Sequence, residues 1–87
     1  MENNTSSTPE TLSVKDLALS SFLLSSDELK LVKVERANNT VYFHFTPRSR
    51  AEELMVAYLS ENAPTVQPRK LFDAMKNLKD LIFSGGQ

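Results

Sequence analysis

The sequence predicts a single small α+β domain, in which helices pack on one face of a two- or three-stranded antiparallel sheet. Residues 29–45 alternate between apolar and polar side chains on both sides of Asn38-Asn39, as a β-hairpin does. Three other stretches have apolar residues at helical spacing. The chain has 87 residues, of which 40% are hydrophobic, and this length supports one modest core. The expected order is helix, β-hairpin, helix, short strand, helix.

The expected domain covers residues 12–83. Residues 1–11 are polar and are predicted to form a disordered tail, and residues 84–87 a frayed C-terminus.

The first helix is predicted to begin after Ser13, which with Asp16 forms a variant of the capping box, and to run from Val14 to about Ser25. Its apolar residues occupy more than one narrow stripe. The helix is therefore either the central core helix or one that partly faces a partner. The candidate partner or oligomer face consists of Leu19, Phe22 and Leu23.

A two-residue type I′ turn over Asn38-Asn39 would place Ala37 opposite Thr40. Counting outward, the expected pairs are Arg36–Val41, Glu35–Tyr42, Val34–Phe43, Lys33–His44 and Val32–Phe45. One face of the hairpin is then apolar, with Val32, Val34, Val41, Phe43 and Phe45, and must be covered by helices. The polar face has Lys33, Glu35, Tyr42 and His44.

The second helix is predicted to begin at Thr46-Pro47, with Ser49 and Glu52 as an alternative capping box, and to run to about Ser60. Residues 62–67 break the helix, and within them residues 65–67 are candidates for a short third strand. The third helix is expected from Pro68 to about Phe83. Its apolar stripe comprises Leu71, Met75, Leu78 and Ile82, widened by Phe72, Leu81 and Phe83.

Several positions match a known sequence pattern over roughly residues 12–83. They are Asp16-Leu17-Ala18, Phe22-Leu23, Val34-Glu35-Arg36, Val41, Phe43, Phe45, Tyr58, Val66, Leu71-Phe72-Asp73-Ala74 and Leu78-Lys79. In these residues the chain resembles a small family of bacterial and mobile-element proteins that is catalogued only as a domain of unknown function. The resemblance implies no activity, cofactor or site residue.

The residue types argue against most enzymes. The chain lacks cysteine, which excludes thiol catalysis, disulfides and thiolate metal sites, and it has one histidine, His44, which cannot form a metal site alone. Both glycines lie in the last three residues, so no phosphate-binding loop is present. We therefore expect no enzymatic activity, no cofactor and no small-molecule substrate. No signal peptide or long apolar run is apparent, and the expected location is the cytoplasm.

Two binding functions remain. The first is a protein-interaction or homo-oligomerising module, for example one from a mobile element, because the first helix is very apolar and a small sheet leaves an edge open. The alternative is a nucleic-acid-binding accessory or regulatory protein, although the net charge of −1 gives it no general support. Its candidate binding surface comprises Lys33, Arg36, Tyr42, His44, Arg48, Arg50, Arg69 and Lys70.

Overall fold

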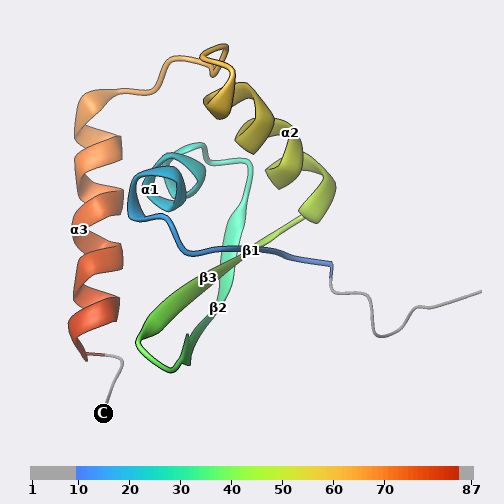
Figure 1. The fold of residues 1–87 in the computed structure, drawn as a ribbon. Coiled ribbons are helices and arrows are strands. Elements are labelled where there is room, and N and C mark those ends of the chain that lie inside the picture. The colour runs from blue at the N-terminus through green and yellow to red at the C-terminus, as the bar shows by residue number, and fades with distance from the viewer. Residues whose placement is uncertain (1–9, 85–87) are drawn as a thin grey trace, which may run out of the picture.

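Three helices and a three-stranded antiparallel sheet make up the computed structural model, which describes residues 10–84 (Figure 1). In chain order the elements are β1 (Leu12–Val14), α1 (Leu17–Ser25), β2 (Lys30–Ala37), β3 (Thr40–Thr46), α2 (Arg48–Leu59) and α3 (Pro68–Ser84). The strand order is β1-β3-β2. The predicted α+β class is confirmed.

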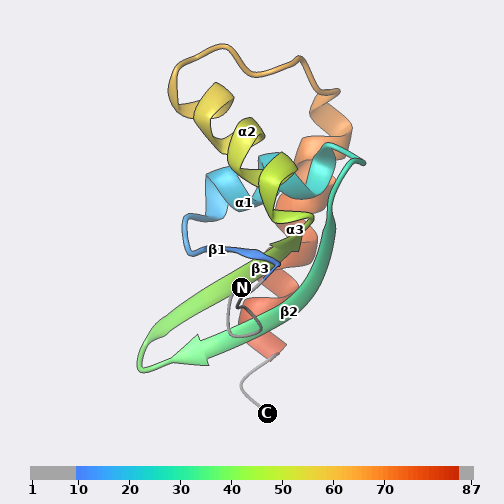
Figure 2. The same ribbon diagram turned by 90° about the vertical axis from the view of Figure 1, so that its right-hand side faces the viewer.

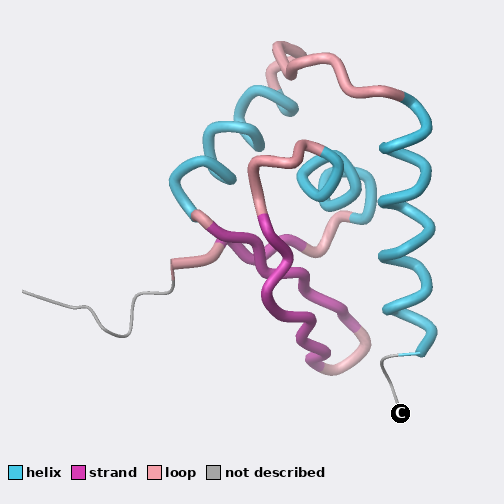
Figure 3. Tube along the Cα trace, turned by 180° about the vertical axis from the view of Figure 1, so that it is seen from behind, coloured by secondary structure: helices cyan, strands magenta, loops and turns pink. Residues whose placement is uncertain are grey.

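The core lies between the sheet and the helices. Phe43 and Phe45 of the central strand β3 are buried, and each helix contributes a fully or almost fully buried leucine, Leu23, Leu54 and Leu78. α1 lies between α2 and α3, as views from opposite sides show (Figures 1 and 3). The prediction of an apolar side shielded by helices is therefore confirmed for Phe43 and Phe45. It is wrong for Val34, which was expected on the same face and is 37% exposed.

The hairpin register is confirmed from the turn as far as the pair Lys33–His44. Beyond it the register shifts between Leu31 and Lys33, so Leu31 rather than Val32 lies opposite Phe45. Val32 occupies this irregularity and is 52% exposed. Its assignment to the apolar face is wrong, because one extra residue in a strand moves the side chains beyond it to the other face.

The hairpin turn is at Asn38-Asn39, as predicted, and it projects beyond α1 and α2 (Figure 2). Its type differs from the expectation. Asn38 has a positive φ of 57°, whereas Asn39 is not among the described residues with positive φ. A type I′ turn requires positive φ at both positions, so the turn belongs to another type.

The third strand comes from the N-terminal side and not from residues 65–67, which lie in the loop before α3. β1 pairs with β3, and Val14 lies opposite Phe43. Val14 is buried while Ser13, opposite His44, is exposed, so this segment follows the two-residue period of a strand.

Helix α1 consequently begins three residues later than the start predicted at Val14. Asp16 is its N-cap and accepts a hydrogen bond from the backbone N–H of Leu19 at 2.8 Å. The predicted box used Asp16 as the third helical residue, but its short carboxylate is itself a preferred N-cap.

The start of α2 also differs in detail. Pro47 is the N-cap without a side-chain hydrogen bond, and Thr46 Oγ1 instead donates to the carbonyl of Glu10 at 3.2 Å. The backbone N–H of Arg48 donates to the same carbonyl at 3.1 Å. These two bonds hold Glu10 against the folded part, although it was assigned to the tail. Ser84, which was predicted to belong to the frayed C-terminus, is the last residue of α3. The remaining predictions for the two termini concern residues 1–9 and 85–87, which lie outside the described residues.

Candidate interaction surface

The predicted partner face on α1 is wrong. Leu19, Phe22 and Leu23 are all buried within the single chain, and Leu23 has no exposed surface. α1 is apolar over most of its circumference because it packs against α3, α2 and the sheet at once. These three side chains could reach a partner only if the domain unfolded.

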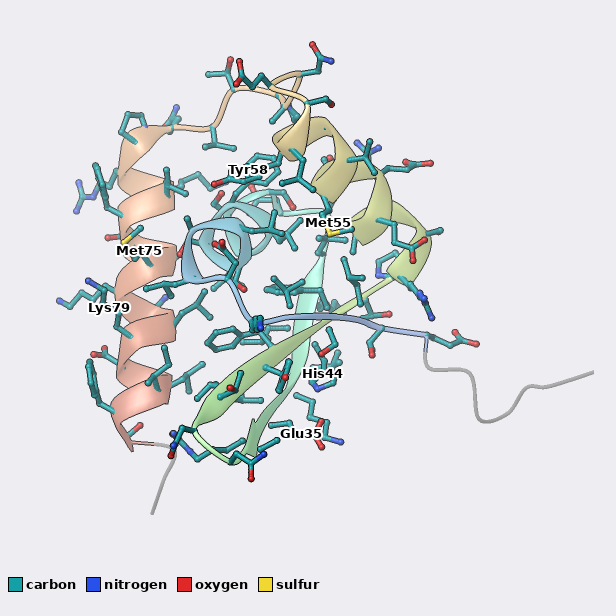
Figure 4. The ribbon with its side chains drawn as sticks, in the orientation of Figure 1. Glu35, His44, Met55, Tyr58, Met75 and Lys79 are labelled. Carbon is teal, nitrogen blue, oxygen red and sulfur yellow. The ribbon has the colours of Figure 1, made fainter. Side chains whose placement is uncertain are left out.

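The polar face of the hairpin forms as predicted. Lys33 lies opposite His44, and Glu35 lies opposite Tyr42. The Glu35 carboxylate contacts His44 Nε2 at 3.0 Å and Lys33 Nζ at 4.0 Å (Figure 4 labels Glu35 and His44). The His44 side chain is only 15% exposed. This face therefore offers a nearly covered ring and a partly neutralised cation, which is little surface for stacking a base.

Two other predicted cations are engaged within the fold. Arg36 Nη2 donates to the carbonyl of Ile82 at 2.6 Å and so joins the turn end of the hairpin to the end of α3. Arg48 Nε donates to Glu52 Oε2 at 2.9 Å, one turn along α2. Both guanidinium groups therefore form hydrogen bonds within the fold.

Arg50 holds two carboxylates. Its Nε and Nη2 donate to Glu28 Oε1 and Oε2 at 2.7 and 3.1 Å, and its Nη1 donates to Glu53 Oε1 at 2.8 Å. The hydrogen bonds from Arg50 lower the pKa of Glu28 from its ordinary value of 4.5, and those to Glu28 and Glu53 raise the pKa of Arg50. The bidentate pair joins α2 to the segment before β2.

The remaining two predicted cations lie at the start of α3, far along the chain from the hairpin. Lys70 is paired with Asp27, beside an open hollow of about 420 Å³ that residues 65–67 and Ser25 also line. The buried hydroxyl of Ser25 donates to the carbonyl of Phe22 at 2.8 Å. Arg69 is exposed.

The eight predicted residues therefore do not form one surface. Lys33, Tyr42 and His44 are brought together on the sheet, and Arg48 and Arg50 lie on α2. Arg36 lies at the hairpin turn, and Arg69 and Lys70 at the start of α3.

The outer side of α3 carries a different set of residues. α3 buries Ala74 and Leu78, whereas Phe72 is 63% exposed and Phe83 is 81% exposed. The two phenylalanines are eleven positions apart, which is close to three helical turns and about 16 Å, so they lie on the same side. Figure 4 shows Lys79, which lies between them in the sequence, pointing away from the body of the protein.

Helical spacing places three cations on this side. Lys76 and Lys79 follow Phe72 by four and seven positions, and Arg69 precedes it by three. We call this set the basic–aromatic face of α3; it consists of Arg69, Phe72, Lys76, Lys79 and Phe83.

The cations of this face differ in their contacts from most other cations of the described residues. Within residues 10–84, no carboxylate lies within ion-pair distance of Arg69, Lys76 or Lys79. Lys33, Arg36, Arg48, Arg50 and Lys70, in contrast, all contact a carboxylate or a carbonyl. Lys15 and Lys30 also lack such a partner in the described part, but they lie at the ends of β1 and β2.

Sequence reasoning missed this face because it assigned Phe72 and Phe83 to the apolar stripe of α3. The spacing of the apolar residues in α3 nevertheless indicated that the two phenylalanines lie away from the core. Leu78 lies almost midway between the two phenylalanines in the sequence, yet helical geometry places it on the opposite side from both.

Neither a cluster of metal ligands nor a membrane-spanning helix occurs within residues 10–84. No group of three or more histidine, aspartate or glutamate residues there could hold a metal ion. Of the helices that the structure describes, none has the length and apolar character needed to cross a membrane.

No protein-family model matches the chain, and no curated protein or solved structure shows significant similarity to it. The family resemblance stated from the sequence stays a prediction.

Proposed function

We propose that this protein is a non-enzymatic protein-interaction module and that the basic–aromatic face of α3 is its contact surface. The partner is a protein surface that carries carboxylates and exposed apolar side chains. One observation carries the proposal: Phe72 and Phe83 are largely exposed on the side of α3 where three cations have no carboxylate partner among the described residues.

Contact with a partner would remove the exposed phenylalanine rings of this face from water. An exposed phenylalanine gains roughly 1.5–3 kcal/mol when its side chain is buried, and aromatic residues are common anchors at interfaces. The cations add specificity and raise the rate of encounter with an acidic surface. Two anchors about 16 Å apart on one helix suit the binding of a helix to a groove.

A protein partner suits this face better than a nucleic acid does. Asp73 and Asp80 lie four positions after Arg69 and Lys76, so carboxylates border the row of cations. They would repel a continuous phosphate backbone, whereas a protein surface of mixed charge can place a cation against them. The net charge of −1 also favours a protein partner over a nucleic acid.

The proposal includes a cytoplasmic location and, if the family resemblance holds, a mobile-element origin. Support for the location is the absence of cysteine from the sequence, which is compatible with a reducing compartment.

Site-specific photocrosslinking tests the proposal. A benzophenone amino acid is placed at position 72 in one variant and at position 42, on the polar face of the hairpin, in another. Both are expressed in the cells that naturally make the protein. We expect protein adducts from position 72 and none from position 42; an adduct between two copies counts as a protein adduct.

The crosslinked partner is then purified and its affinity measured. The double variant Phe72→Ser/Phe83→Ser should bind it about tenfold more weakly or worse, since each lost anchor costs about 1 kcal/mol or more. Val32→Ser/Val34→Ser on β2, which also removes two exposed apolar side chains, is the control and should bind normally. Adducts with nucleic acid from position 42, or equal affinity of both double variants, would refute the proposal.

A further inference from the structure

The acidic and apolar surface that the basic–aromatic face requires is present on this chain, at the C-terminal end of α2. Val56 and Leu59 are 60% and 67% exposed. They are three positions apart and therefore adjoin each other on the helix surface. Glu61 follows them and is exposed. We call these three residues the acidic–apolar end of α2.

The local electrostatics of this end are negative. The last turn of α2 contains no basic residue, and the C-terminus of a helix carries about half a negative charge. Glu61 has no cation within ion-pair distance among residues 10–84. The end of α2 and the outer side of α3 thus hold charges of opposite sign that have no ion-pair partner among residues 10–84, each beside a pair of exposed apolar side chains.

The turn after α2 fixes the position of Glu61. Its backbone N–H donates to the carbonyl of Tyr58 at 3.2 Å, and the N–H of Asn62 donates to the carbonyl of Ala57 at 2.8 Å. This pair of hydrogen bonds forms a Schellman motif, which holds the residue after the helix in one conformation. The backbone of Glu61 is therefore fixed at the helix end.

These two surfaces cannot meet within one molecule. α1 lies between α2 and α3, and the outer sides of the two helices face away from each other (Figures 1 and 3). A contact between them must join two copies. Because it uses different surfaces on the two partners, it is heterologous and can repeat from copy to copy.

We propose that the protein self-associates head to tail, with the acidic–apolar end of α2 of one copy docked on the basic–aromatic face of α3 of the next. Val56 and Leu59 pack against the ring of Phe72 or Phe83, and Glu61 faces Lys76 and Lys79. This inference rests on the proposed function and names its partner as a second copy. The contact involves few side chains, so association is weak and depends on concentration.

Sedimentation velocity of the full chain tests the inference with two double variants. Phe72→Ser/Phe83→Ser removes the anchors on α3, and Val56→Ser/Leu59→Ser removes those on α2. The average mass of the wild type is expected to rise with concentration, up to about 1 mM, and to pass that of a dimer. Each double variant alone is expected to remain monomeric.

An equimolar mixture of the two double variants provides the sharpest result. Each retains the surface that the other lacks, so one intact contact can form and the mixture should give a 1:1 dimer and nothing larger. The double variant Val32→Ser/Val34→Ser serves as the matched control and should associate as the wild type does. Salt of about 0.5 M should weaken association, because the charges are exposed and screened.

Circular dichroism shows whether each variant is folded, and thermal unfolding should resemble that of the wild type because all four mutated side chains are exposed. A wild type that stays monomeric at the highest concentration would overturn this inference. The proposed function would then require a different protein as the acidic partner of α3. A variant that associates alone, or a mixture that forms no dimer, would overturn the inference too. If photocrosslinking from position 72 gave no protein adduct, the proposed function itself would be refuted.

Discussion

The buried serines of α1 differ in what their hydroxyls contact. Ser21 Oγ donates to the carbonyl of Leu17 at 2.7 Å, and Ser25 Oγ donates to that of Phe22 at 2.8 Å. Ser20 is fully buried, and its Oγ has no hydrogen-bond partner among the described residues. A buried hydroxyl without a partner loses its hydration and gains nothing in return.

Ser20→Ala should therefore stabilise the domain. We expect the free energy of unfolding to rise by about 1 kcal/mol, because the substitution removes an unsatisfied polar atom and alanine favours a helix more than serine does. Urea denaturation measures the change. The control is Ser21→Ala, which removes a satisfied hydroxyl and should stabilise less. A lower stability of Ser20→Ala would show that this hydroxyl is hydrogen-bonded after all.

At the scale of elements, the end of α2 combines a well-formed turn with an unfavourable residue. Glu61 has a positive φ of 62° in the Schellman motif that closes the helix. Glycine is the usual residue at this position, because a side chain with a Cβ atom is strained at positive φ. The helix therefore ends here because the Schellman hydrogen bonds close it and because residues 62–67 do not continue it.

Glu61→Gly is expected to raise the free energy of unfolding by about 1 kcal/mol, since it relieves the left-handed strain. The control is Asn62→Gly. Asn62 is not among the described residues with positive φ, so glycine there should only add disorder to the unfolded chain and lower stability. Thermal unfolding in dilute solution measures both. If the two variants shift the midpoint in the same direction, the conformation of residue 61 is not the cause.

At the scale of the whole molecule, β1 joins the start of the described chain to its centre. It lies at the edge of the sheet beside β3, and Val14 opposite Phe43 belongs to the buried core. The sheet thus has β3 in the middle, with a long neighbour on one side and a three-residue neighbour on the other. This closes one edge of the central strand that a simple hairpin would leave open.

Val14→Ala should lower the free energy of unfolding by about 1–3 kcal/mol, because it removes buried methyl groups from the core. Ser13→Ala is the matched control. Ser13 is exposed and should change stability by less than about 0.5 kcal/mol. Equal effects of the two substitutions in chemical denaturation would mean that residues 12–14 do not pack as a strand.

Local patterns in the sequence predicted much of this fold. The hairpin from Lys33 to His44 follows from turn residues and alternation, which act between neighbours. The bounds of α2 and α3 agree closely with the structure, because a proline marks each start and periodic apolar residues mark each length. β1 was missed, because three residues are too few for alternation to outweigh a capping pattern.

What the sequence alone determined is the α+β class, the hairpin and the extent of two helices, since all of these arise from interactions a few residues apart. The tertiary structure alone decided which apolar residues are buried. Leu23 and Phe83 are both apolar, yet Leu23 has no exposed surface and Phe83 is 81% exposed. It likewise decided which cations meet a carboxylate, because Arg50 reaches Glu28 only after α2 docks beside the start of β2. Burial and charge pairing depend on distances across the fold, and the candidate surface on α3 follows from them.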